Sequence, residues 1–184
     1  TLIRKGHRVA VCEQLESPAE AKKRGYKSIV NRGVTRVVTP GTLTEDSLLD
    51  ARRHNFLAAY ANVRGEGALA WVDISTGAFS VLSCDGAELG PELARLNPKE
   101  VLLNDAGEAD FGIIVEYSGA AVTLLGNAAF DSTNGEKRLC HVYSVSSLDG
   151  FGAFTRAEVA SLAAVVEYLD ITQKGKLPLL RPPV

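Results

Sequence analysis

Three short apolar segments, close together in the chain, decide its fold: Phe56-Leu-Ala-Ala-Tyr-Ala-Asn-Val63, Ala68-Leu-Ala-Trp-Val-Asp-Ile-Ser75 and Ala78-Phe-Ser-Val-Leu-Ser83. Between them lie Arg64-Gly-Glu-Gly67 and Thr76-Gly77, whose glycines can adopt the positive φ angles of tight turns. Strand-forming segments joined by such short turns predict three consecutive antiparallel strands.

The middle strand is apolar on both of its faces. Leu69 and Trp71 lie on one face, and Ala70 and Val72 lie on the other. A strand that is apolar on both faces is typical of a sheet covered by helices on both sides. The pattern therefore predicts an α/β domain built around this strand.

The segments that follow alternate between helix and strand patterns. They are, in order, a helix near Glu88–Leu96, strands at Val101–Leu103 and Ala121–Leu125, and a weaker helix within Ala128–Tyr143. A last helix begins at the capping box Thr155-Arg-Ala-Glu158. Three meander strands followed by helices and further strands are typical of a ribonuclease-H-like fold, which we expect over residues 56–172.

The first part of the chain predicts a smaller α/β piece without a whole core of its own. His7–Cys12 and Val34–Thr39 have strand patterns, and Pro40-Gly41 ends the second of them. Between these strands, the capping box Ser17-Pro-Ala-Glu20 begins a short helix that should end at Gly25.

These patterns divide the chain into four parts. Residues 1–42 form the α/β piece, 43–55 a polar linker, 56–172 the main domain, and 173–184 a proline-rich exit where a following domain would begin. The sequence contains no Met, even at position 1, and its first six residues have the pattern of a helix end. We therefore expect the chain to be a piece of a longer protein.

Composition places the chain among globular proteins. Of its 184 residues, 46% are hydrophobic and 23% are charged, with a net charge of −2, which excludes disordered, collagen-like and coiled-coil classes. No apolar run approaches the ~18 residues of a membrane span, and no export signal opens the sequence. Cys12, Cys84 and Cys140 are odd in number and far apart, which favours reduced thiols in a cytosolic protein.

Charge is distributed unevenly along the chain. Residues 1–36 contain nine basic and three acidic side chains, a balance of +6, whereas the rest has a balance of −8. A basic segment could face a phosphate backbone. The alternative is a solvated surface whose balancing acids lie on another segment.

Asp73 is the one tempting catalytic candidate, since a ribonuclease-H-like nuclease holds two Mg²⁺ ions with clustered carboxylates. The strands expected around it, including Val101–Leu103, contain no further Asp or Glu. We therefore favour Asp73 as an acceptor for backbone N–H groups of the turn at Ser75-Thr76-Gly77. A nuclease that uses Asp73 remains the alternative.

Other motifs do not indicate a catalytic or metal site. The sequence has no Gly-x-x-x-x-Gly-Lys-Ser/Thr loop for nucleotide phosphates. Gly150-Phe-Gly152 is more typical of a tight helix entry than of a dinucleotide site. Cys140-His141 has no second pair to complete a metal site.

Several motifs resemble the MutS family of bacterial DNA mismatch-repair proteins. Val9-Ala-Val-Cys-Glu13-Gln14 and Val34-Thr-Arg-Val-Val-Thr39-Pro40-Gly41-Thr42 are similar to the end of that family's mismatch-recognition domain. The glutamate-glutamine and Thr-Pro-Gly-Thr signatures are specific, and we expect them to be structural. Leu69-Ala-Trp-Val-Asp-Ile-Ser-Thr-Gly-Ala-Phe79, Leu148-Asp-Gly-Phe-Gly152 and Tyr168-Leu-Asp-Ile-Thr-Gln173 resemble the following connector domain.

The resemblance implies a non-catalytic connector that joins mismatch recognition to an ATPase core and offers a docking surface to MutL. The parent protein would be a cytoplasmic homodimer that binds mismatched double-stranded DNA and hydrolyses ATP. ATP and Mg²⁺ would bind a domain beyond Val184, so we expect no cofactor, metal or membrane contact in this chain. Arg32 and Arg36 could approach DNA phosphates in the intact protein.

We expect the MutL-docking residues to be Glu136, Lys137 and Arg138, three successive charges on the weaker helix. A solvated helix face is the alternative. Arg138→Glu should weaken MutL recruitment without lowering the melting temperature. An unrelated α/β scaffold, in which this region has no effect on MutL, is a third possibility.

Overall fold

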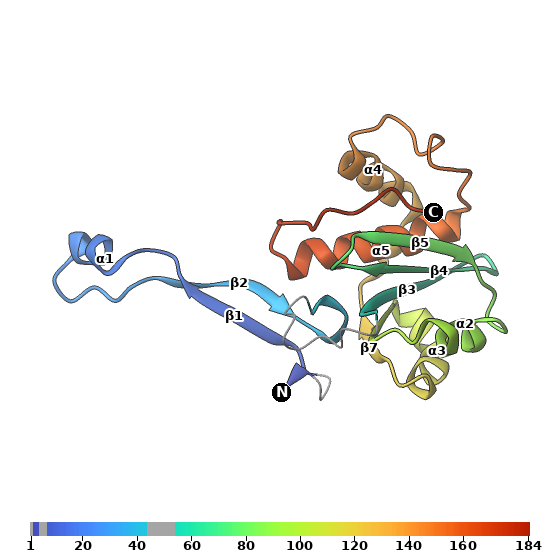
Figure 1. Ribbon diagram of the computed structural model, residues 1–184, viewed down its shortest axis with the longest axis horizontal. Coiled ribbons are helices and arrows are strands. Elements are labelled where there is room, and N and C mark those ends of the chain that lie inside the picture. Colours follow the sequence, from blue (N-terminus) through green and yellow to red (C-terminus); the bar gives the residue numbers. More distant parts are fainter. Residues whose placement is uncertain (1, 4–6, 44–53) are drawn as a thin grey trace.

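The computed structural model describes residues 2–3, 7–43 and 54–184. The helix end expected at residues 1–6, and most of the linker expected at 43–55, lie outside the described residues. The described chain forms a layered α/β body from which a long two-stranded ribbon extends (Figure 1).

A mixed five-stranded sheet forms the centre of the body. Its strands are β3 (Phe56–Val63), β4 (Glu66–Asp73), β5 (Ala78–Ser83), β6 (Glu100–Leu103) and β7 (Ala121–Leu124). Their spatial order is β5-β4-β3-β6-β7. The first three strands pair antiparallel, as the turn pattern predicts, whereas β6 and β7 run parallel to β3.

Helices cover both faces of this sheet (Figure 1). Helices α4 (Ser132–Tyr143) and α5 (Arg156–Thr172) pack on the face that carries Leu57 and Val72. Helices α2 (Leu89–Leu96) and α3 (Asp105–Tyr117) pack on the opposite face. The expected burial of both faces of the middle strand is therefore confirmed.

The capping signals in the sequence mark where the helices begin. Thr155 Oγ1 accepts the Glu158 amide at 3.2 Å, and the Glu158 carboxylate accepts the Thr155 amide at 2.7 Å, so the predicted capping box starts α5. Ser17 and Glu20 form the same arrangement at α1 (Pro18–Arg24). Asp131 accepts the amide of Thr133 at 2.8 Å, which offsets the poor helix formers in the first turn of α4.

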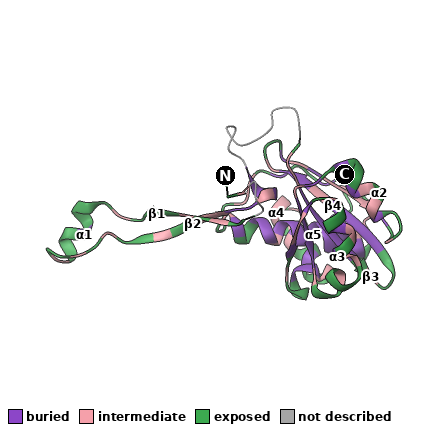
Figure 2. Cartoon of the chain, turned by 90° about the horizontal axis from the view of Figure 1, so that it is seen from below, coloured by how far each residue is buried: buried purple, intermediate pink, exposed green. Residues whose placement is uncertain are grey.

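A two-stranded antiparallel ribbon carries the N-terminal basic residues away from the body. It consists of β1 (Val9–Gln14) and β2 (Arg32–Val38), with α1 between them at the far end. Figure 2 shows that most of its residues are exposed, in contrast to the buried sheet. This agrees with the expectation that the segment lacks a whole core of its own.

The last residues extend the sheet beside β5. The Arg181 amide donates to Gly77 O at 2.8 Å, and the Val81 amide donates to Val184 O at 2.9 Å. Leu180 is buried against the α5 side of the core. The stretch that the sequence indicates as an exit therefore packs on the body in this chain.

Two elements differ from the sequence prediction. Helix α3 was not expected, because Gly107, Gly112 and four acidic residues obscure its pattern; Asn104 caps it by accepting the Gly107 amide at 2.7 Å. Strand β6 begins at Glu100, one residue earlier than predicted. The expectation that this strand contains no acid was wrong, since it starts with a buried glutamate.

No helix among the described residues is long and apolar enough to cross a membrane. The three cysteines are free thiols: Cys12 is exposed, Cys140 is half-buried and Cys84 is buried.

Candidate functional site

The most elaborate polar site in the described chain surrounds the carboxylate of Glu100, at the start of β6. Its side chain is only 1% exposed and is held by four donors. Oε2 accepts the Thr39 hydroxyl at 2.6 Å and the Gly41 amide at 2.9 Å. Oε1 accepts the Thr123 hydroxyl at 2.6 Å and the Tyr168 hydroxyl at 2.7 Å. Each oxygen thus serves a different part of the molecule.

The donors on Oε2 are Thr39, which directly precedes the 3-10 turn η2 (Pro40–Thr42), and Gly41 within that turn, which follows the ribbon. The Thr39 amide donates to Thr42 Oγ1 at 2.9 Å, and the two threonine hydroxyls are also 2.9 Å apart. The Asn55 side chain donates to Pro40 O at 3.0 Å. The Thr-Pro-Gly-Thr signature is therefore a compact turn with its donors directed at Glu100.

Gly41 permits this close approach. A Cβ at Gly41 would lie 2.9 Å from Glu100 Cβ and 2.9 Å from Leu57 Cδ1, closer than nonbonded carbon atoms normally lie. The glycine in the signature is thus explained by the space that Glu100 and β3 leave to it.

The donors on Oε1 come from Thr123 of β7, a strand of the same sheet, and from Tyr168 of α5, which packs on the face to which Glu100 points. Burial, together with the adjacent Glu100 charge, raises the pKa of Tyr168, so that its hydroxyl remains protonated and donates. Glu100 therefore connects the end of the ribbon to three elements of the body: β6, β7 and α5.

Asp73 has the role that the sequence favours for it. Its Oδ1 accepts the Ser75 amide at 3.0 Å and the Ser75 hydroxyl at 2.5 Å, and its Oδ2 lies 3.0 Å from His54 Nδ1. Burial alone would raise the pKa of Asp73, but the hydrogen bonds from Ser75 and His54 lower it below its ordinary value. The turn-acceptor interpretation is confirmed.

Asp73 and Glu100 do not form one acidic pocket. Asp73 pairs with Phe56 and Glu100 pairs with Leu57, successive residues of β3. Because side chains alternate along a strand, the two carboxylates point to opposite faces of the sheet. Within the described ranges, no group of three or more His, Cys, Asp or Glu side chains could hold a metal ion.

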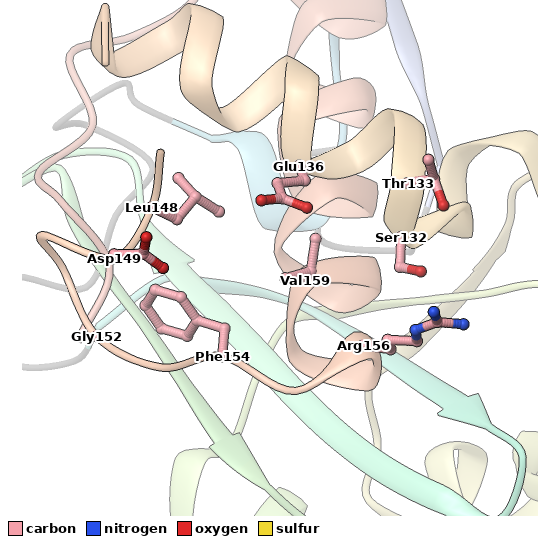
Figure 3. Close-up of a pocket in the computed structure, with 9 residues that line it drawn as sticks. All are labelled: Ser132, Thr133, Glu136, Leu148, Asp149, Gly152, Phe154, Arg156 and Val159. Carbon is pink, nitrogen blue, oxygen red and sulfur yellow. The ribbon is translucent and has the colours of Figure 1, made fainter. Parts of the chain in front are cut away.

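The α4 surface contains the charges that we expect to contact a partner. Glu136 and Lys137 are exposed, whereas Gly135 and Leu139 face the core. A cavity of about 190 Å³ opens beside Glu136, between α4 and the residues that precede and begin α5. Figure 3 shows Glu136, Ser132 and Thr133 on one side of it, and Asp149, Phe154 and Arg156 on the other.

Arg138 differs from its two neighbours. Its side chain is 29% exposed and forms an ion pair with Glu167 of α5, with Nη2 2.7 Å from Oε2. A glutamate at this position would place two like charges together, so the expected neutrality of Arg138→Glu toward the melting temperature is corrected. Lys137 provides a cleaner probe of the surface.

The ribbon carries the remaining residues that the sequence indicates. Arg32 and Arg36 lie on β2; Arg32 is exposed and Arg36 is half-buried. Glu13 and Gln14 lie on β1, paired with Gly33 and Arg32 respectively, and both are exposed. None of these four residues is among the donors to the Glu100 carboxylate.

The sequence is similar to known proteins along its whole length. The family profile described as MutS domain II matches residues 55–181, and that described as MutS domain I matches residues 1–47. The chain is 61% identical to the DNA mismatch repair protein MutS of Roseobacter denitrificans, 63% to that of a Ruegeria species and 60% to that of Paracoccus denitrificans. These alignments cover the whole chain, which spans 21% of the length of each relative.

Proposed function

The chain belongs to the MutS family, and from this premise we propose that it is a non-catalytic connector within a larger DNA mismatch-repair protein. Residues 1–42 would complete a mismatch-recognition domain, 56–172 would form the connector, and 173–184 would lead into the following domain. The observation that carries this proposal is the seating of Thr39–Thr42 on Glu100, because it ties the end of one part to the core of the next.

We propose that the connector has a ribonuclease-H-like fold. The order β5-β4-β3-β6-β7 supports this proposal, with an antiparallel meander followed by parallel strands. The carboxylates of Asp73 and Glu100 are occupied by donors from the protein itself and lie on opposite faces. That arrangement favours a scaffold over a nuclease that uses Asp73.

In the intact protein, the exposed ribbon would lie nearest to DNA. Its basic residues, including Arg32 and Arg36, fit contacts with phosphates of mismatched double-stranded DNA. The sequence has no phosphate-binding loop, so we place ATP and Mg²⁺ in another domain of a cytoplasmic, homodimeric parent. Arg32→Ala should reduce the slope of log affinity against log salt by about one if it contacts a phosphate.

We propose that the outer face of α4 docks MutL. Glu136 and Lys137 are exposed there, and the adjacent cavity gives the surface a recess for a partner side chain. The test is recruitment of MutL to mismatched DNA by the full-length protein, measured by cross-linking. Lys137→Glu should reduce recruitment, whereas Lys176→Glu, an equal charge change at an exposed site outside α4, should not.

Equal recruitment by both variants would argue against docking on α4. The melting temperature should be unchanged in either variant, because both lysines are exposed. A loss of recruitment without a loss of folded protein would thus assign the effect to the surface.

A further inference from the structure

We propose that Glu100 is a latch that holds the ribbon rigidly on the body, and that its two oxygens have separate tasks. Oε2 holds the turn that ends the ribbon, and Oε1 anchors the glutamate to β7 and α5. The consequence for mismatch repair rests on the proposed function, but the latch itself is argued from the geometry alone.

The turn lies at the base of the ribbon, so the position of the turn determines the position of the ribbon. Strand β2 ends at Val38, and the next residue, Thr39, donates to Glu100. The ribbon leaves the body at this place, while α1 at its far end lies well away from the sheet (Figure 1). Fixing Thr39 and Gly41 therefore fixes the place at which the ribbon joins the body.

Burial makes the latch a two-state device. Glu100, Thr39 and Thr42 are each no more than 2% exposed. A buried carboxylate that loses two of its donors is strongly disfavoured until water replaces them. The turn is consequently either seated with both donors on Oε2 or released into water, and intermediate displacements are unfavourable.

The division between the oxygens allows the turn to be released without loss of the connector fold. The contacts on Oε1 come from α5, which is held by the core on its face of the sheet, and from β7, which is held by its pairing with β6. Losing the contacts on Oε2 affects only the turn and the ribbon behind it. A force on the ribbon would pass through a seated latch to β6 and α5.

Hydrogen exchange at the Gly41 amide tests the latch directly in this chain, without DNA or MutL. Thr39→Val keeps the shape of the side chain and removes one donor from Oε2, together with the contact between the Thr39 and Thr42 hydroxyls. Exchange at Gly41 should then be about tenfold faster or more, as expected for loss of one hydrogen bond to a charged group. Thr123→Val is the matched control, because it makes the same change of side chain, removes one donor from Oε1 and should leave Gly41 exchange within about twofold of the original chain.

Unchanged exchange at Gly41 in Thr39→Val would overturn the latch. Equal acceleration in Thr39→Val and Thr123→Val would overturn the separate tasks of the two oxygens. Thermal unfolding of both variants identifies a general loss of fold. If the exchange results hold but full-length Thr39→Val recruits MutL to mismatches normally, the latch stands and its proposed role in mismatch repair fails.

Discussion

Helix α4 contains a glycine, Gly135, at the place where it crosses α5. A Cβ added there would lie 2.6 Å from Ala163 Cβ, and Ala163 is fully buried. Carbon atoms normally lie about 3.5–4.0 Å apart, so Gly135→Ala would force the helices apart by about 1 Å.

The expected free-energy change follows from two opposing effects. Replacing a helical glycine with alanine favours the helix by about 1 kcal/mol, whereas overpacking a core costs about 1–3 kcal/mol. Because backbone and buried side chains surround Gly135, the second effect should dominate. We expect Gly135→Ala to reduce the free energy of unfolding by roughly 1–2 kcal/mol.

Gly112→Ala is the matched control, since Gly112 also lies within a helix, α3. Its added Cβ would meet only Glu108 Cγ, at 3.3 Å, on an exposed and flexible side chain. This variant should gain up to about 1 kcal/mol in urea unfolding. If Gly135→Ala were stabilised as much as Gly112→Ala, the close packing of α4 on α5 would be refuted.

Three further predictions concern single side chains. Hydrogen bonds lower the pKa of Asp73 below 3.8, so the ionised carboxylate stabilises the fold above that pH, and this stabilisation is lost on acidification. The free energy of unfolding of Asp73→Asn should therefore decline less steeply than that of the original chain between about pH 5 and pH 3. Burial raises the pKa of the Cys84 thiol to about 11, so iodoacetamide at neutral pH should modify exposed Cys12 in the folded chain and Cys84 only after denaturation, as followed by mass spectrometry. Thr155→Ala removes the cap of α5 and should cost about 1 kcal/mol in urea unfolding, whereas a loss within experimental error would show that the cap is dispensable.

Much of the body follows from local sequence patterns. Strands β3, β4 and β5 have apolar runs bounded by glycine turns, and α5 has a capping box and a long apolar stripe. These signals lie within a few residues of the structure that they determine. The turn-acceptor role of Asp73 was equally local, because its partner Ser75 is two residues away.

The junction could not be found in this way. Thr39, Thr123 and Tyr168 are separated from Glu100 by 61, 23 and 68 residues. No periodicity brings these four positions together, and a glutamate before an apolar run ordinarily indicates a strand end in water. The only available signal was the Thr-Pro-Gly-Thr signature. Its partner, Glu100, can be identified only from the pairing of β6 with β3.

The distance between the ribbon and the body tests the central claim most directly. Spin labels would be attached to exposed Cys12 on β1 and to Asp110→Cys on α3, with Cys140→Ser removing the half-buried thiol. Pulsed electron paramagnetic resonance should give a narrow distribution of distances between the two spin labels in the original chain and a broad distribution in Thr39→Val. Distributions of equal width in the two proteins, whether both narrow or both broad, would contradict a ribbon held by Glu100.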